Sequence, residues 1–318
     1  SPFLTIVANS ITVLPFKVTR PSLINPQLYD DTSYGRTLGQ AGLFYYSDPT
    51  PGTENGLGFT GYAEAPTFNV AGGLYERPLT GENAVTISVP ANSVVRYTLD
   101  STDPNETSPL YTGPIEIERN TVIRARAFRD GVEASQIISQ TYLISVYHTM
   151  PVICLTTDPD NLWNEEYGAL ADGPNIDKST STPWFKNATY GQKNWFPAWL
   201  EYTDENGQLQ ISQGVRFRIM GQYSLDMPQK SMFIKADGQF GKSEFDYALF
   251  DDRPYTTYKS FVLRNGGQDG LYTRVMDGLE ARIIDQADST LVTQSWKPVI
   301  VYIDGEYWGH FNMRERAG

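Results

Sequence analysis

Lys230 is the residue whose type and position most directly indicate chemistry in this sequence. It shares one face of an expected strand with Met232 and Ile234, so its ammonium group either reaches solvent or meets an anion. A lysine that contacts phosphate fits this position. Glu280, beside the apolar stripe of an expected helix, is a candidate partner that would hold the ammonium group charged and oriented. The alternatives are a solvated lysine and an exposed surface glutamate.

An amphipathic helix over residues 269–287 is expected to carry Glu280. Its apolar residues fall at positions i, i+4, i+8 and i+12, which is typical of a helix that packs one face on a sheet. Lys230 is therefore expected to point into a concave face of the sheet bounded by this helix. The apolar residues are Leu271, Val275, Leu279 and Ile283.

Short strands joined by tight turns are expected to form that sheet. Asn206-Gly207 and Asp304-Gly305 each lie between apolar runs, and such pairs favour the two-residue turn of a β-hairpin, type I′ for the first pair. A buried strand is expected near residue 152. Asp158 or Asp160 is expected to cap the short helix that follows it, and a metal site is the alternative.

The longest motif of this half reads GVRFRIMGQYSLDMPQKSMFIKAD, over residues 214–237. It contains a strand with alternating arginines, Arg216 and Arg218, then a glycine, a polar turn and a Pro-x-Lys-Ser sequence. With FDYALFDD, YKSFVLRNGGQDG and WKPVIVYIDGEYWGHFNMRER, it resembles the CotH (spore coat protein H) kinase-like family. The resemblance covers residues 150–318.

The resemblance implies the truncated, mixed-sheet N-terminal portion of an atypical kinase-like domain. It implies that Arg216, Arg218, Lys230 and Glu280 bind ATP. For the complete domain it implies ATP with Mg or Mn as cofactors, and transfer of phosphate to an acceptor protein that the sequence does not identify.

The sequence also departs from the family pattern. Met220 and Leu225 stand where many relatives carry arginine, which would remove charge-assisted contacts to phosphate. The catalytic and metal-holding aspartates of the family are expected beyond Gly318, so the chain is expected to have no catalytic residue and to be catalytically incomplete. The alternative is a surface adhesion or glycan-binding protein that uses the kinase-like fold without chemistry.

Residues 65–146 show short strands separated by turns, which indicate a small immunoglobulin-like β-sandwich. The motif VVRYTLDSTDPNETSPLYTGPIEIERNTVIRARAF resembles the chitobiase/β-hexosaminidase C-terminal-type module. Strand alternation predicts one buried face and one face toward water. The expected buried residues are Ile123, Ala125 and Ala127, and the expected exposed residues are Arg124 and Arg126.

Two further segments are rich in turn residues. Asp100 to Pro104 supply side-chain oxygens that can close a turn, and calcium binding is the alternative. Residues 1–60 resemble the tail of a lamin-tail-like domain, or form an irregular arm.

The composition is that of a β-rich, acidic protein with net charge −12, which disfavours nucleic acid as a partner. A single cysteine, Cys154, rules out disulfide bonds within the chain, and no apolar run reaches the roughly 20 residues of a membrane span. The expected class is therefore an α+β multidomain protein, the sandwich followed by the mixed sheet. We expect an extracellular or cell-surface location, with an acceptor protein or surface glycan as partner.

Overall fold

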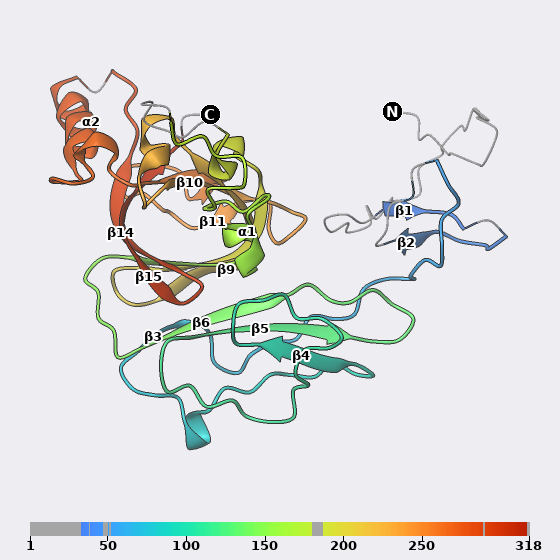
Figure 1. Ribbon diagram of the computed structural model, residues 1–318. Helices are drawn as coiled ribbons and strands as arrows, with labels where there is room; N and C mark the ends of the chain where they lie inside the picture. The colour runs from blue at the N-terminus through green and yellow to red at the C-terminus, as the bar shows by residue number, and fades with distance from the viewer. Residues whose placement is uncertain are drawn as a thin grey trace.

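The computed structural model shows a chain built mainly of β-strands (Figure 1). Its described strands form a four-stranded sheet, a closed seven-stranded barrel and two small two-stranded sheets. The expected α+β class is wrong, because a closed barrel takes the place of the mixed sheet and the described residues contain two short α-helices. The structure describes residues 33–37, 39–46, 50, 52–179, 187–288 and 290–316.

The barrel strands follow the order β10-β13-β15-β14-β7-β8-β9 around the axis. β7 and β14 are parallel, and every other neighbouring pair is antiparallel. Closure pairs the edges that an open sheet would leave free, which is the physical reason for the difference from the expected sheet. The strands are β7 (Val152–Thr156), β8 (Phe196–Thr203), β9 (Leu209–Met220), β10 (Ser231–Ala236), β13 (Ser260–Arg264), β14 (Trp296–Ile303) and β15 (Glu306–Glu315).

Alternate residues of the barrel strands pack around the axis. On β14, Val299, Val301 and Ile303 belong to the large core cluster, whereas Ile300 and Tyr302 belong to a separate cluster shared with the other unit. Aromatic and aliphatic side chains fill the interior, as expected for a barrel of this size. Chemistry of this unit must therefore lie on its outer face or at its ends.

The four-stranded sheet, in the order β3-β6-β5-β4, forms the core of a sandwich-like unit. β3 pairs parallel with β6, whereas the other two pairs are antiparallel, so the sheet is mixed. Extended segments joined by isolated bridges, such as Val85 with Ile115 and Leu79 with Ile117, cover one face of the sheet. The strands are β3 (Gly73–Tyr75), β4 (Val94–Thr98), β5 (Thr121–Phe128) and β6 (Ile138–Ile144).

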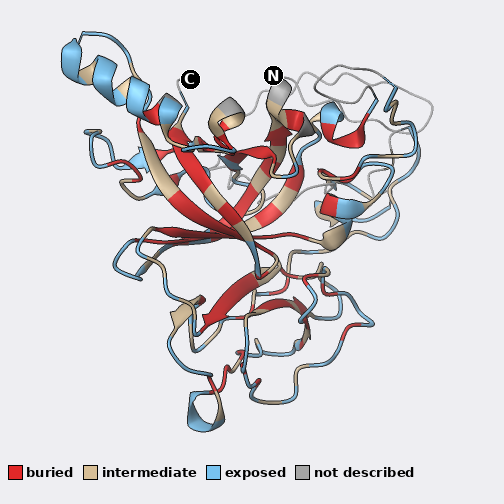
Figure 2. Cartoon of the chain, turned by 60° about the vertical axis from the view of Figure 1, so that its left-hand side comes forward, coloured by how far each residue is buried: buried red, intermediate tan, exposed pale blue. Residues whose placement is uncertain are grey.

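Strand β5 has the predicted buried face but not the predicted exposed face. Ile123, Ala125 and Ala127 are fully buried in the sandwich core, which confirms the alternation. Arg124 is 6% exposed, and Arg126 is half-buried. The prediction of an exposed Arg124 is wrong because Ser101, Asp103 and the β14–β15 turn with Asp304 lie near its guanidinium group. Figure 2 shows the barrel packed against the sandwich.

The remaining elements are small. The predicted lamin-tail-like segment lies largely outside the described residues, and its described part forms the pair β1-β2. No helix among the described residues is long and apolar enough to cross a bilayer. The elements are β1 (Ser33–Gly35), β2 (Phe44–Tyr46), β11 (Phe245–Asp246), β12 (Thr257–Tyr258), α1 (Pro159–Trp163), α2 (Met276–Ala287) and the 3₁₀ helices Gly81–Asn83, Thr189–Gln192, Tyr223–Asp226 and Gly267–Asp269.

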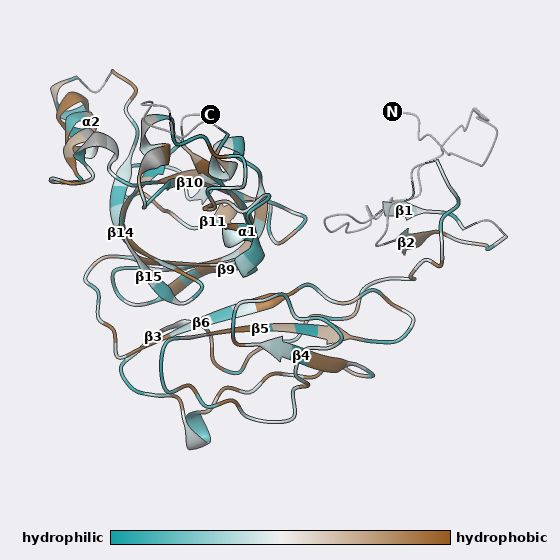
Figure 3. Cartoon of the chain, in the orientation of Figure 1, coloured by the Kyte–Doolittle hydropathy of each residue, from teal (hydrophilic) through white to brown (hydrophobic). Residues whose placement is uncertain are grey.

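Helix α2 does not bury the predicted apolar stripe. Leu271 lies before the helix and is 85% exposed, and Leu279 and Ile283 are also exposed. The close contact with the barrel is made instead by Gly278, where an added Cβ atom would overlap the ring of Trp296. A glycine lets the helix backbone approach the strand, so the leucine stripe is turned away from the sheet. Figure 3 shows both hydrophobic and hydrophilic residues on α2.

The two hairpin signals give two different turns. Asp304 and Gly305 both have positive φ, 50° and 81°, and form the two-residue turn between β14 and β15 that was expected. Between β8 and β9 the hairpin forms, but of the Asn206-Gly207 pair Gly207 alone has positive φ. The predicted type I′ turn is wrong there because the Asp204 carboxylate accepts from two backbone N–H groups and supports a wider turn.

Two aspartates cap local structure as predicted. The Asp158 carboxylate accepts a 2.9 Å hydrogen bond from the backbone N–H of Asp160 and caps α1. The Asp100 carboxylate accepts from the backbone N–H of Thr102 at 3.1 Å and closes its turn. Both roles depend on local backbone geometry, which explains why residue type and spacing were sufficient to predict them.

Charged groups lie where the sandwich meets the barrel. The Arg124 guanidinium group forms an ion pair with Asp103 and donates to the carbonyl of Ser101 at 2.7 Å. The backbone N–H of Asp103 in turn donates to the Asp158 carboxylate at 2.8 Å. Burial raises the pKa of Asp304, in the β14–β15 turn, to about 7, while hydrogen bonds and the charge of Arg124 oppose this shift.

Glu201 on β8 is a second buried acid at the same interface. Its carboxyl group accepts a 2.9 Å hydrogen bond from the backbone N–H of Thr141 on β6. Burial raises the pKa of Glu201 to about 8, so the neutral form predominates below that pH. Gly72 lies against the same carboxyl group, and a Cβ atom at this position would overlap it.

Replacement of Glu201 by glutamine is expected to raise the free energy of unfolding in mildly alkaline solution. A carboxyl group whose pKa rises from 4.5 to about 8 on folding contributes stability that is lost as pH rises through that window. The neutral amide does not titrate, so E201Q avoids this loss. We expect its free energy of unfolding to exceed that of the wild type by about 1–3 kcal/mol at about pH 8.5 and to differ little at about pH 5. Urea denaturation of both proteins at the two pH values measures this difference.

Glu306→Gln is the matched control, because Glu306 is exposed at the start of β15. It should leave the pH dependence of unfolding as in the wild type. An E201Q protein no more stable than the wild type at alkaline pH would contradict the burial argument.

Candidate functional site

Lys230 precedes β10 and points toward one end of the barrel core. Its ammonium group donates to the carbonyls of Leu225, at 2.7 Å, and Met227, at 3.2 Å. The same group lies 3.9 Å from the centroid of the Tyr190 ring. The residue is 7% exposed, and the carbonyl dipoles and the ring face offset the cost of burying its charge. Lys230 therefore holds the turn between β9 and β10, and contact with ATP stays a prediction.

Hydrogen bonds fix the residues on both sides of this lysine. The Asn265 amide donates to the carbonyl of Gln229 at 2.7 Å, and the Ser231 hydroxyl donates to the Asn265 side-chain oxygen at 3.0 Å. The Arg274 guanidinium group donates to the Gln229 side chain at 2.7 Å and to the carbonyl of His310 at 2.9 Å. The turn is thus tied to β13 and β15.

The structure does not gather the four predicted ATP-binding residues into one site. Arg216 points outward from β9, forms a 3.0 Å ion pair with Asp237 and lies over the ring of Phe240. Glu280 is exposed on α2 and forms no ion pair with the described residues. Its predicted pairing with Lys230 is therefore absent, because α2 turns its Gly278 side to the barrel.

Arg218 lies in a cluster of cations and aromatic rings on the outer surface of the barrel. Its guanidinium carbon is 5.0 Å from the ring centroid of Trp195 and 5.5 Å from that of Phe233. The guanidinium carbon of Arg316 lies 4.2 Å from the same Phe233 ring. We call these four residues, together with Arg314, the arginine face.

Strand register explains why these residues meet. Arg218 on β9 lies opposite Phe233 on β10, Phe233 lies opposite Val262 on β13, and Val262 lies opposite Arg314 on β15. Residues directly opposite one another point to the same face of a sheet, so this row crosses four strands. Within the described part of the chain, neither Arg218 nor Arg316 pairs with a carboxylate. The row is a local cationic surface on an acidic protein.

Sequence reasoning identified Arg218 but missed its neighbours. Arg314 and Arg316 alternate along NMRER, and strand alternation could have placed both on one face. Trp195 lies outside any strand, and nothing in the sequence indicated that it approaches β9. Leu225, where the family resemblance predicts arginine, is 4% exposed and packs in the barrel core, where burial of a further charge would be costly.

The arginine face has the chemistry of an anion-binding surface. Guanidinium groups form bidentate, charge-assisted hydrogen bonds with phosphate oxygens, and ring faces hold the guanidinium planes in place. The Nε atom of Arg218 is buried and has no hydrogen-bond acceptor among the described residues. No group of three or more histidine, cysteine, aspartate or glutamate side chains in the described part of the chain is arranged to hold a metal ion.

Replacement of Lys230 by methionine is expected to lower the free energy of unfolding by about 1–3 kcal/mol, because two carbonyl groups lose their buried donor. Lys235→Met, at an exposed position of β10, is the matched control and should change stability by less than about 0.5 kcal/mol. Chemical denaturation of both variants measures the difference. Equal stability of the two variants would show that the ammonium group does not hold the turn.

Comparison with known families supports the resemblance in part. Residues 85–142 match the family model described as Fn3 associated, and residues 217–318 match the one described as CotH kinase protein. No curated protein matches the chain. The chitobiase-type and lamin-tail-like assignments remain predictions. The CotH resemblance is confirmed over residues 217–318, which include Arg218, Lys230 and the other arginines of the arginine face.

Proposed function

We propose that the barrel unit is the nucleotide-binding part of a CotH-type atypical protein kinase, and that its arginine face holds the phosphates of ATP. The observation that carries the proposal is the placement of Arg218 and Arg316 over the same Phe233 ring, with neither guanidinium group paired to a carboxylate of the described residues. The match of residues 217–318 to the CotH kinase protein family supports the choice of ATP over other anions.

Each residue of the face has a distinct role in this proposal. Arg218 and Arg316 bind phosphate oxygens through charge-assisted hydrogen bonds. Trp195 is 38% exposed and offers a ring face on which a base can stack. The ring of Phe233 contacts both guanidinium groups. Lys230 and Arg216 act indirectly, by holding the β9–β10 turn and the outer edge of β9.

ATP with Mg or Mn would supply the phosphoryl group for an acceptor protein. We assign no catalytic residue within the described part of the chain. We further propose an extracellular or cell-surface location, on the resemblance of the amino-terminal segments to modules of secreted proteins. The second candidate function is surface adhesion without phosphoryl transfer. Met220 and Leu225 favour it, because two apolar residues stand where the family resemblance predicts arginines that could contact phosphate.

Calorimetric titration with ATP and Mn tests the proposal on the purified chain. Arg218→Gln and Arg316→Gln should each weaken binding by about tenfold, equal to about 1.4 kcal/mol, and the affinity should fall as salt is added. Arg77→Gln, at an exposed position of the sandwich unit, is the control and should bind as the wild type does.

Equal affinity of the three variants would remove the arginine face as the nucleotide site. Failure of the wild-type chain to bind ATP at millimolar concentration would favour the adhesion candidate.

A further inference from the structure

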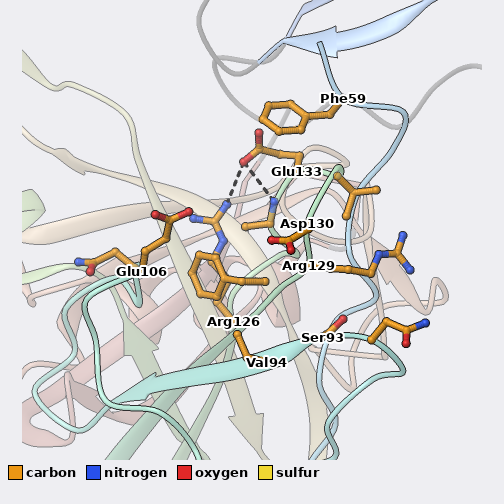
Figure 4. A pocket seen from close by; sticks show the side chains of 13 residues that line it. Phe59, Ser93, Val94, Glu106, Arg126, Arg129, Asp130 and Glu133 are labelled. Atoms are coloured by element: carbon orange, nitrogen blue, oxygen red, sulfur yellow. Dashed lines mark hydrogen bonds and ion pairs between the residues drawn. The ribbon is translucent and has the colours of Figure 1, made fainter. Parts of the chain in front are cut away.

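The sandwich unit contains a cavity of about 740 Å³, none of whose lining residues belongs to the arginine face (Figure 4). The start of β4 and the end of β5 form its floor, with Val94, Arg126 and Phe128. The loop after β5 and the turn that contains Glu106 form two walls. Phe59, from the segment that precedes the sandwich, covers one side. The volume lies within the range of about 300–1,000 Å³ that is usual for small-molecule sites.

The walls of this cavity are fixed by contacts within the protein. The Arg126 guanidinium group donates to the carbonyl of Ser135 at 2.8 Å and lies 3.9 Å from the Glu133 carboxylate. The backbone of Glu133 exchanges two hydrogen bonds with the segment before the sandwich, to Gly61 at 2.8 Å and from Ala63 at 2.7 Å. The loop, the strand and the covering segment are thus held together, so the site is formed before a ligand arrives.

The polar lining is mixed in charge and nearly balanced. Arg126 and Arg129 carry positive charge, and Glu106, Asp130 and Glu133 carry negative charge. A strongly anionic or cationic ligand would meet like charges on one side of the cavity. A hydroxyl group both donates and accepts, so a ligand with many hydroxyl groups can satisfy guanidinium donors and carboxylate acceptors at once.

Apolar groups complete the lining. Phe59 presents a ring surface and Val94 an aliphatic one (Figure 4). The ring of Phe128, which also lines the cavity, lies under the Arg126 guanidinium group. Pyranose rings have C–H faces that pack on such surfaces while their edges carry hydroxyl groups. The combination of ring surfaces and paired opposite charges therefore favours a sugar over a purely apolar or purely ionic compound.

We infer that this cavity binds a short neutral oligosaccharide. The inference concerns the sandwich unit and does not depend on nucleotide binding by the barrel. Glu106 and Asp130, both exposed at the cavity, accept from sugar hydroxyl groups, and Arg126 donates to them.

The test uses the purified chain and three neutral trisaccharides, cellotriose, chitotriose and maltotriose, with trigalacturonate as a charged probe. Calorimetry or saturation-transfer NMR should detect binding of at least one neutral trisaccharide, with a Kd in the micromolar to millimolar range. The variant E106A/D130A should weaken this binding at least tenfold. Val94→Arg, which places a long side chain into the cavity, should abolish it.

Glu118→Ala is the matched control, an exposed carboxylate of the same unit outside the cavity lining, and should bind as the wild type does. Circular dichroism and thermal melts show that each variant is folded. No binding of any neutral trisaccharide, tighter binding of trigalacturonate, or binding unaffected by both cavity variants would overturn the inference. Variants of the arginine face that lose ATP binding should still bind the sugar. The result of one test therefore does not decide the other proposal.

Discussion

Pairing of β9 with β10 closes the barrel, and both the core and the outer surface of the unit depend on it. The register places Phe217 opposite Ile234 on the inside and Arg218 opposite Phe233 on the outside. A shift of one residue would exchange these faces, sending the arginines into the core and the aromatic residues to solvent. Lys230 stands at the start of this pairing and fixes the turn that sets the register.

Contacts between the two units depend on polar groups that water cannot reach. A small apolar cluster that includes Leu143, Cys154 and Ile300 forms the seam, and buried charges such as Arg124 lie at its border. Apolar contacts tolerate small shifts, whereas a buried polar group that loses its hydrogen-bond partner costs about 1–3 kcal/mol. The buried hydrogen bond from the Thr141 backbone N–H to the Glu201 carboxyl group crosses the seam and therefore favours one relative placement of sandwich and barrel.

Features set by neighbouring residues could be predicted from the sequence, and features set by distant contacts could not. The caps at Asp158 and Asp100 and the Asp304-Gly305 turn follow from a few adjacent residues. Exposure of Arg124 was predicted wrongly because a strand pattern does not reveal which unit covers its second face. The predicted burial of the apolar stripe on α2 was wrong for the same reason, since Gly278 and not the stripe makes the contact with the barrel.

The candidate site likewise has features that the sequence predicts and features that depend on distant contacts. Arg218 was named through its place in the family motif, but the ring contacts that distinguish it from Arg216 depend on residues far apart in sequence. Closure of the barrel was missed because periodicity shows that strands exist and does not show which strands pair.

Asp158 uses both of its oxygens, one for the backbone of its own helix at Asp160 and the other for the backbone of Asp103 in the sandwich. The same carboxylate thus completes a helix terminus in one unit and a turn in the other. Separation of the units would leave the Asp103 amide without its acceptor and would expose the apolar seam. Melting of one unit would therefore remove contacts that its neighbour uses, so we expect the unfolding of the two cores to be coupled.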